Sequence, residues 1–155
     1  MKTYEIGVRA EGCVLAALIK SGYTVLIPFG GTQRYDLVVD MGNGFKTVQC
    51  KSGVLRRGAI RFRVDSSGPA RPRKAYGDEV DFFGVYCAEN DETYLVPSSE
   101  MGTAMGVLRV EASRNNQVKG VRLAERYRLQ QPLPAAGGEP KCCESPVAIE
   151  TSLVK

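Results

Sequence analysis

Residues 35–51 read YDLVVDMGNGFKTVQCK, and they predict the hairpin around which the rest of the chain is organised. The first half of this stretch is rich in β-branched residues, and the second half is another extended run. Between them, residues 41–44 read MGNG, and Asn-Gly is a pair that tight reversals between two strands prefer. We therefore expect two antiparallel strands, over residues 35–40 and 45–51.

Three polar side chains converge in this predicted hairpin. Because strand side chains alternate between the two faces of a sheet, Gln49 and Lys51 share one face of the second strand. With the reversal at residues 42–44, Asp36 lies roughly opposite that pair at the open end of the hairpin. A carboxylate, an amide and an ammonium brought together by two strands are more typical of a phosphodiesterase site than of a surface ion pair.

The composition limits the chemistry that such a site can perform. The chain has 155 residues, 43% of them hydrophobic, which is enough for one domain with one core. It contains no histidine, which excludes Ser-His-Asp and Cys-His catalysis, His-Cys zinc sites and the histidine-metal nucleases. The five cysteines form no CxxC pair, and Cys13, Cys50 and Cys87 lie in apolar runs, as reduced core residues do. Hydrolysis would depend on carboxylates, lysine and a metal that accepts oxygen ligands.

A basic block occupies residues 56–74. It contains seven basic residues and one acid, Asp65, in a chain whose net charge is only +4. Such a block suits a polyanion, and a solvated surface is an equally common explanation for a charge run. We expect loops over residues 52–57 and 66–75, the second because glycine and proline interrupt it. The candidates for contacts with a phosphate backbone are Arg56, Arg57, Arg61, Arg63, Arg71, Arg73 and Lys74.

The N-terminal segment, from residue 3 to about residue 20, is expected to be a helix that ends before Gly22. Its predicted apolar stripe, at spacings of three and four residues, consists of Val8, Leu15, Leu18 and Ile19. Glu11 falls on this stripe, and a buried carboxylate needs a partner. One interpretation is a partly exposed position at the edge of the stripe. The more specific hypothesis is that Glu11 reaches the hairpin and joins Asp36.

The remaining segments predict an α/β sheet with a helix packed against it. Further strands are expected at residues 23–27, 60–64, 80–87, 93–96 and 107–110. The polar residues 113–117 are better explained as a turn than as base-contacting side chains. From about residue 130 the chain is dense in proline, glycine and small residues without periodicity, so we expect residues 130–155 to be a disordered tail. We expect no contact with a membrane and a cytoplasmic location, since there is neither a spanning apolar run nor a signal pattern.

The order of these features resembles the core of the PD-(D/E)XK nucleases: a helix bearing Glu11, then Pro28, then Asp36 at the head of a strand, then Gln49-Cys50-Lys51 in the next. Residues 4–53 are closer still to the small endonucleases associated with group I introns. The similarity continues through FRVDSSG, YGDEVDFFGVYCAENDETYLVP and LRVEASRNNQVKGVRLAERYRL, and so covers about residues 1–129. It implies a restriction-endonuclease-like core, a mixed central β-sheet flanked by helices, in residues 1–129.

The resemblance also implies a Mg²⁺-dependent endonuclease acting on double-stranded DNA, bound to the nucleoid while it works. Asp36, Gln49, the backbone carbonyl of Cys50 and Glu11 would hold the metal, and Lys51 would orient or deprotonate a water or stabilise transition-state charge. Most members of the superfamily carry Asp or Glu at the position of Gln49. An amide oxygen coordinates Mg²⁺ without adding negative charge, and Glu11 is expected to restore that charge. One centre cuts one strand, so cleavage of a duplex implies a homodimer or a homotetramer.

Two alternatives stay open at this point. The same fold could serve a structure-selective nuclease, such as a Holliday-junction resolvase or a repair or restriction enzyme. The second alternative is a catalytically silent protein that keeps the core and only binds DNA. Gln49 makes this possible, because it stands where most of the superfamily carry an acid. Tyr76 and Asp81 lie in the resembling segments, but the sequence assigns them no role.

Overall fold

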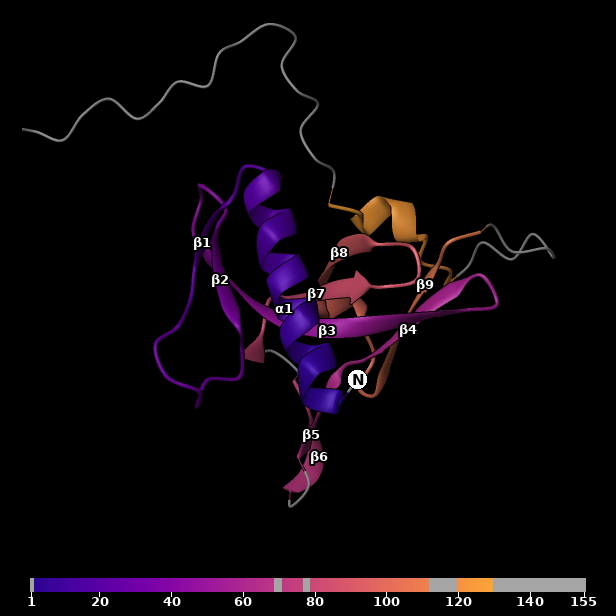
Figure 1. Ribbon diagram of the computed structural model, residues 1–155, viewed down its shortest axis with the longest axis horizontal. Helices are drawn as coiled ribbons and strands as arrows, with labels where there is room; N and C mark the ends of the chain where they lie inside the picture. The colour runs from indigo at the N-terminus through magenta and orange to yellow at the C-terminus, as the bar shows by residue number, and fades with distance from the viewer. Residues whose placement is uncertain (1, 69–70, 77–78, 112–119, 130–155) are drawn as a thin grey trace, which may run out of the picture.

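The helix α1 packs across a mixed β-sheet (Figure 1). The computed structural model describes residues 2–68, 71–76, 79–111 and 120–129. The elements, in chain order, are α1 (Thr3–Lys20), β1 (Thr24–Leu26), β2 (Leu37–Asp40), β3 (Phe45–Arg56), β4 (Ala59–Arg63), β5 (Asp65–Gly68), β6 (Arg71–Ala75), β7 (Phe82–Cys87), β8 (Glu92–Pro97), η2 (Ser98–Glu100), β9 (Met105–Arg109) and η3 (Ala124–Tyr127). The predicted α/β architecture is confirmed, and so are the strands expected near β1, β4, β7, β8 and β9.

The hairpin of β2 and β3 closes through the predicted turn. The register pairs Asp40 with Phe45, and the Met41 N–H donates to the carbonyl of Gly44 at 3.0 Å. The Gly42 N–H donates to the Asp40 carboxylate at 2.8 Å. Gly42 has a φ of 79°, a conformation that glycine adopts at little cost. The sequence-based prediction of this hairpin is therefore confirmed.

Strand β3 contacts three partners in succession. Its residues 45–48 pair with β2, residues 48–53 pair in parallel with β7, and residues 54–56 pair with β4. The predicted loop over residues 52–57 is therefore wrong, because the strand continues to Arg56. The reversal that follows is only two residues long, Arg57 and Gly58, with φ of 51° and 69°. Positive φ at both positions gives a turn whose twist matches that of the two strands. Arg56 and Arg57 are exposed here, so their charges stay in water.

The prediction that residues 66–75 lack regular structure is also wrong. Residues 66–68 and 71–75 belong to β5 and β6, which pair antiparallel from Asp65 opposite Ala75 to Gly68 opposite Arg71, with a register shift between Ser66 and Gly68. A two-stranded ribbon has two free edges, so Pro72 can be accommodated without removing a ladder hydrogen bond. In Figure 1 this ribbon projects from the body of the molecule.

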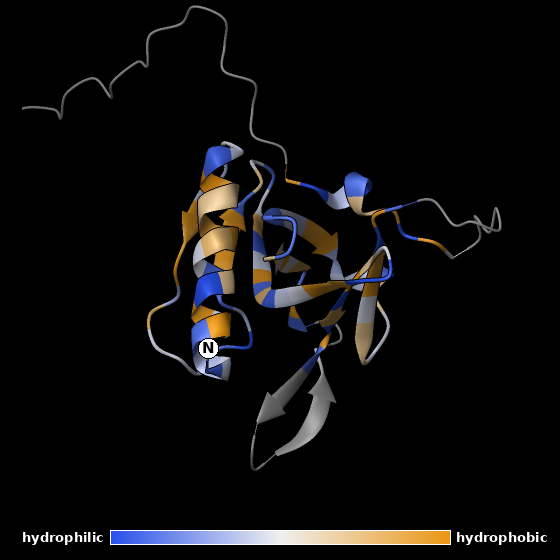
Figure 2. Ribbon diagram, turned by 45° about the vertical axis from the view of Figure 1, so that its right-hand side comes forward, coloured by the Kyte–Doolittle hydropathy of each residue, from blue (hydrophilic) through white to orange (hydrophobic). Residues whose placement is uncertain are grey.

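The face of α1 that meets the sheet matches the predicted stripe in part: Leu18 is buried and Leu15 is partly buried against the same core. The helix side chains buried there are Ala10, Val14 and Leu18. Val8 and Ile19 are instead 49% and 56% exposed. A Cβ atom on Gly84 of β7 would lie 2.5 Å from Cγ1 of Val14, so the helix approaches the sheet closely and small side chains occupy the contact. Figure 2 shows the apolar stretches of the strands that α1 covers.

The opposite face of the sheet carries a second core, whose aromatic members are Phe62, Tyr76, Phe83, Tyr94 and Tyr127. Of the cysteines, Cys50 and Cys87 are buried and Cys13 is partly buried, all three as free thiols. Among the described residues, no helix combines the length and apolar character that crossing a bilayer requires. The predictions for residues 113–117 and 130–155 lie outside the described residues.

Candidate active site

Asp36 directly precedes β2 and lies beside β3, at the end where the pairing of the two strands finishes. Its N–H donates to the carbonyl of Val48 at 2.9 Å, which continues the ladder by one bond. Its carboxylate oxygen Oδ2 then accepts the Cys50 N–H at 2.7 Å and the Gln49 side-chain amide at 2.5 Å. Residues 49–53 of β3 pair with β7 but not with β2, and the Asp36 carboxylate takes the place of a β2 partner at the Cys50 N–H. The predicted meeting of Asp36 and Gln49 is confirmed.

Lys51 lies in the same region, two residues further along β3. Val48 and Cys50 pack in the core under α1, so alternation places Gln49 and Lys51 on the face away from the helix. The Lys51 ammonium donates to the hydroxyl of Tyr76 at 3.1 Å. Burial lowers the pKa of Lys51, and the nearby charges of Asp36 and Asp65 act against that decrease. The ammonium is therefore close enough to Asp36 for their charges to interact.

Glu11 reaches this region from the other face, on α1. It is partly exposed and follows the buried Ala10, so it lies at the edge of the helix contact face. Burial raises the pKa of Glu11, and the charge of Asp36 raises it further. Burial also raises the pKa of Asp36, against the opposing effects of the Cys50 N–H, Lys51 and Gln49. The edge interpretation of Glu11 is therefore confirmed. That Glu11 joins Asp36 in one acidic site stays a prediction, which the effect of Asp36 on the pKa of Glu11 supports.

The donor set suits a hard divalent cation. Among the described residues, no three His, Cys, Asp or Glu side chains lie close enough together to hold a metal. The available oxygen donors are two carboxylates, Asp36 and Glu11, the Gln49 amide, and the Cys50 carbonyl, which lies 3.4 Å from that amide nitrogen. Two acids of raised pKa near one another concentrate negative charge that a cation would neutralise. Oxygen ligands of this kind are what Mg²⁺ prefers in proteins.

Comparison with known proteins gives the family of the chain. The PD-(D/E)XK endonuclease family matches residues 1–130. The chain belongs to that family. A solved structure of a bacterial homing endonuclease, I-Ssp6803I, superposes with a TM-score of 0.65 at 25% identity, covering 83% of this chain and 89% of that chain. No curated protein matches the sequence.

The structure also brings to the site of this PD-(D/E)XK endonuclease two residues that the sequence left without a role. Tyr76 is 7% exposed and accepts the Lys51 hydrogen bond. The backbone carbonyl of Asp65 lies 3.4 Å from the same ammonium, and its buried carboxylate binds Arg63 through two hydrogen bonds of 2.8 and 2.5 Å. Both residues come from the base of the β5–β6 ribbon. The sequence carries no local signal for them, because strand pairing brings them to Lys51.

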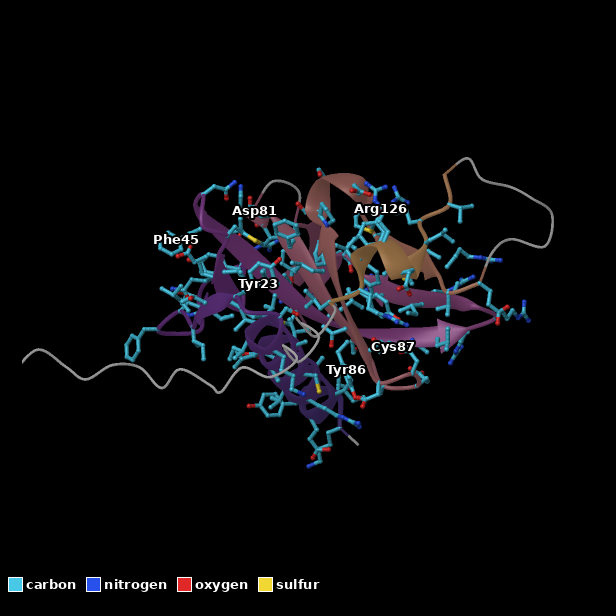
Figure 3. The ribbon with its side chains drawn as sticks, turned by 90° about the horizontal axis from the view of Figure 1, so that it is seen from above. Tyr23, Phe45, Asp81, Tyr86, Cys87 and Arg126 are labelled. Atoms are coloured by element: carbon cyan, nitrogen blue, oxygen red, sulfur yellow. The ribbon has the colours of Figure 1, made fainter. Side chains whose placement is uncertain are left out.

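Asp81 has a structural position in the same endonuclease. Its carboxylate accepts the N–H and the hydroxyl of Thr47, both at 2.9 Å, and the ammonium of Lys46 at 3.1 Å. These hydrogen bonds connect Asp81, just before β7, to the first residues of β3. Figure 3 labels Asp81 close to Phe45, the first residue of β3. The same figure places Tyr86 beside α1, where its hydroxyl accepts a hydrogen bond from Arg9.

The predicted basic residues divide into separate groups. At the end of the β3–β4 hairpin, a surface cavity of about 490 Å³ is lined by Arg56, Arg57 and Arg61. Arg63 is held in the ion pair with Asp65. The positions of Arg71, Arg73 and Lys74 are on β6, whose side chains lie outside the described part of the structure. Two hairpins, rather than the predicted loops, carry the basic block.

Proposed function

We propose that this protein is a Mg²⁺-dependent deoxyribonuclease that hydrolyses phosphodiester bonds in double-stranded DNA, in the manner of group I intron homing endonucleases. The observation that carries this proposal is the hydrogen bonding of Gln49 and Cys50 to Asp36, with Lys51 next to them on β3 and within electrostatic reach of Asp36. Glu11 on α1 is also within electrostatic reach of Asp36. Membership of the PD-(D/E)XK endonuclease family supports it, as does the likeness to a bacterial homing endonuclease.

The proposed roles follow from the chemistry of each group. Asp36, Glu11, the Gln49 amide oxygen and the Cys50 carbonyl would hold the cation. When bound, Mg²⁺ supplies Lewis acidity toward the scissile phosphate and a bound water. The Lys51 ammonium lies within electrostatic reach of Asp36 and would stabilise negative charge that develops on the phosphate. Burial lowers the pKa of Lys51 while the charges of Asp36 and Asp65 oppose that decrease, and we assign stabilisation of charge as its principal role.

The basic groups contribute affinity rather than chemistry. Arg56, Arg57 and Arg61 lie together on an exposed hairpin, and arginines in such an arrangement bind phosphates without reading base sequence. The strand positions of Arg71, Arg73 and Lys74 supply a second basic segment on the projecting ribbon. Because each chain contains one such centre, we propose that a homodimer or homotetramer makes a double-strand break.

A cleavage assay on pooled random DNA duplexes tests the proposal. Purified protein is incubated with the pool in Mg²⁺, and the new ends are sequenced. We expect cleavage at a limited set of sites that EDTA abolishes. Preferential cleavage of four-way junctions would instead identify a structure-selective nuclease on the same fold. Binding to duplexes without cleavage in Mg²⁺ or Mn²⁺ would identify a silent DNA-binding relative and reject the catalytic assignment.

A further inference from the structure

The ammonium of Lys51 is held by the base of the β5–β6 ribbon. It donates to the hydroxyl of Tyr76 at 3.1 Å, lies 4.5 Å from the centroid of that ring, and lies 3.4 Å from the carbonyl oxygen of Asp65. The nitrogen is thus nearest to the hydroxyl end of the tyrosine. A lysine side chain has four rotatable bonds, so an unrestrained ammonium would occupy many positions.

Tyr76 is itself firmly placed. Its ring packs edge-on against Phe83, with centroids 5.8 Å apart and planes at 81°, and is part of the core on the face away from α1. The guanidinium of Arg34 lies 4.6 Å from the centroid of the same ring, and Arg34 forms an ion pair with Glu79. Core packing and this cation fix the ring, and therefore also fix the hydroxyl oxygen to which Lys51 donates.

We propose that Tyr76 is the positioning residue for Lys51: its hydroxyl holds the ammonium in one place, within electrostatic reach of Asp36, before a scissile phosphate arrives. This inference rests on the proposed nuclease function. A group that must stabilise charge in a transition state is more effective when its position is set before the substrate arrives. Burial, together with the charge of Asp36, raises the pKa of the Tyr76 phenol, so the hydroxyl stays neutral and can accept the lysine hydrogen bond.

A second buried tyrosine provides a matched control. Tyr94 is 1% exposed, belongs to the same core as Tyr76, and accepts a hydrogen bond from the Asn90 side chain at 2.8 Å. The substitutions Tyr76→Phe and Tyr94→Phe each remove one buried hydroxyl and one hydrogen bond. Only the first removes a contact with Lys51. A purely structural role for Tyr76 predicts similar effects of the two substitutions.

Steady-state kinetics on a cleaved duplex provide the first readout. In Tyr76→Phe we expect kcat to fall roughly ten- to a hundredfold, the effect of losing one hydrogen bond to a charged group, with KM nearly unchanged. Tyr76→Leu, which also removes the ring from beside the ammonium, should reduce kcat further. Tyr94→Phe should keep the wild-type kcat. A kcat within twofold of wild type in Tyr76→Phe would overturn the proposal.

The ammonium itself provides a readout that does not depend on cleavage. In ¹H–¹⁵N spectra of lysine side chains, a hydrogen-bonded, partly buried ammonium exchanges slowly enough to give a signal, which Lys51→Arg assigns by its absence. We expect this signal in wild type and Tyr94→Phe and its loss in Tyr76→Phe. Its absence from wild type, or its persistence in Tyr76→Phe, would overturn the positioning role even if the protein cleaves DNA. If the protein does not cleave DNA, the spectra still decide whether Tyr76 holds Lys51.

Discussion

Replacement of Gln49 by glutamate tests the donor set at the site most sharply. The Gln49 amide nitrogen donates to Oδ2 of Asp36 at 2.5 Å. Gln49→Glu replaces that donor with a carboxylate oxygen and places a third acid beside Asp36 and Glu11. Burial already raises the pKa of both of those acids, so the added charge is unfavourable in the absence of a cation. A bound divalent ion reverses the effect, because it gains a charged ligand in place of a neutral one.

The structure gives the size of the expected change. Losing a hydrogen bond to a charged group costs about 1.5–3 kcal/mol. Repulsion between the two carboxylates adds to this, but partial exposure and proton uptake limit the addition. We expect the free energy of unfolding at neutral pH in EDTA to fall by about 2–4 kcal/mol, which lowers Tm by roughly 4–16 °C for a domain of this size. Mg²⁺ should recover more of the Tm in Gln49→Glu than it adds to wild type.

Thermal unfolding in EDTA and in a Mg²⁺ series measures both effects. Gln49→Leu is the control, because it removes the hydrogen bond without adding a charge, and its Tm should gain no more from Mg²⁺ than that of wild type. The reasoning fails if Gln49→Glu melts like wild type in EDTA. It also fails if Mg²⁺ leaves the difference between the two proteins unchanged.

Three further predictions concern DNA affinity, pH dependence and packing. Arg61→Ala should weaken duplex binding and reduce the slope of log K against log salt by about 1, as measured by fluorescence anisotropy across a salt series. The control is Arg126→Ala, whose side chain is 72% exposed and lies outside the basic block. It should change neither the affinity nor the slope. Because the pKa of Glu11 is raised in the folded protein, the contribution of Glu11 to stability is fully present below its ordinary value of 4.5 and is lost as pH rises from there through the folded pKa. Glu11→Gln should flatten that dependence in urea titrations, and an unchanged pH profile would contradict the assignment. Gly84→Ala would place a Cβ 2.5 Å from the Val14 side chain and should cost about 1–3 kcal/mol in urea unfolding. Gly12→Ala, with no atom within 4 Å, should be neutral or stabilising; equal effects of the two would refute the close helix contact.

The core of the site was predictable because local rules determine it. Alternation along β3 and the Asn-Gly reversal together predict Gln49 and Lys51 near Asp36. In the structure Gln49 is hydrogen-bonded to Asp36, and Lys51 lies two residues further along β3. These are short-range signals, which depend on strand periodicity and turn chemistry alone. The position of Glu11 was harder to predict, since it depends on how α1 is rotated against the sheet.

The errors arise where tertiary packing overrides local pattern. The apolar Val8 and Ile19 suggested one face of α1, but the close approach to Gly84 selects the face with Ala10 and Val14. Glycine and proline in residues 66–75 suggested loops, although a two-stranded ribbon tolerates both.

Tyr76 could not be linked to the site from the sequence. It lies 25 residues after Lys51, and the pairing of β5 with β6 brings it to the ammonium. A contact between residues so far apart depends on the whole fold, and no spacing rule encodes it.

Single-turnover cleavage of duplex DNA by wild type and Asp36→Asn is the most direct test of the proposed centre. One oxygen of Asp36, Oδ2, accepts both the Cys50 N–H and the Gln49 amide, so an asparagine oxygen can keep both hydrogen bonds while the charge is lost. We predict Mg²⁺-dependent cleavage by wild type and a rate more than roughly a hundredfold lower in Asp36→Asn, with a similar Tm. Cleavage by Asp36→Asn at the wild-type rate would show that the reaction does not occur at this edge of β3.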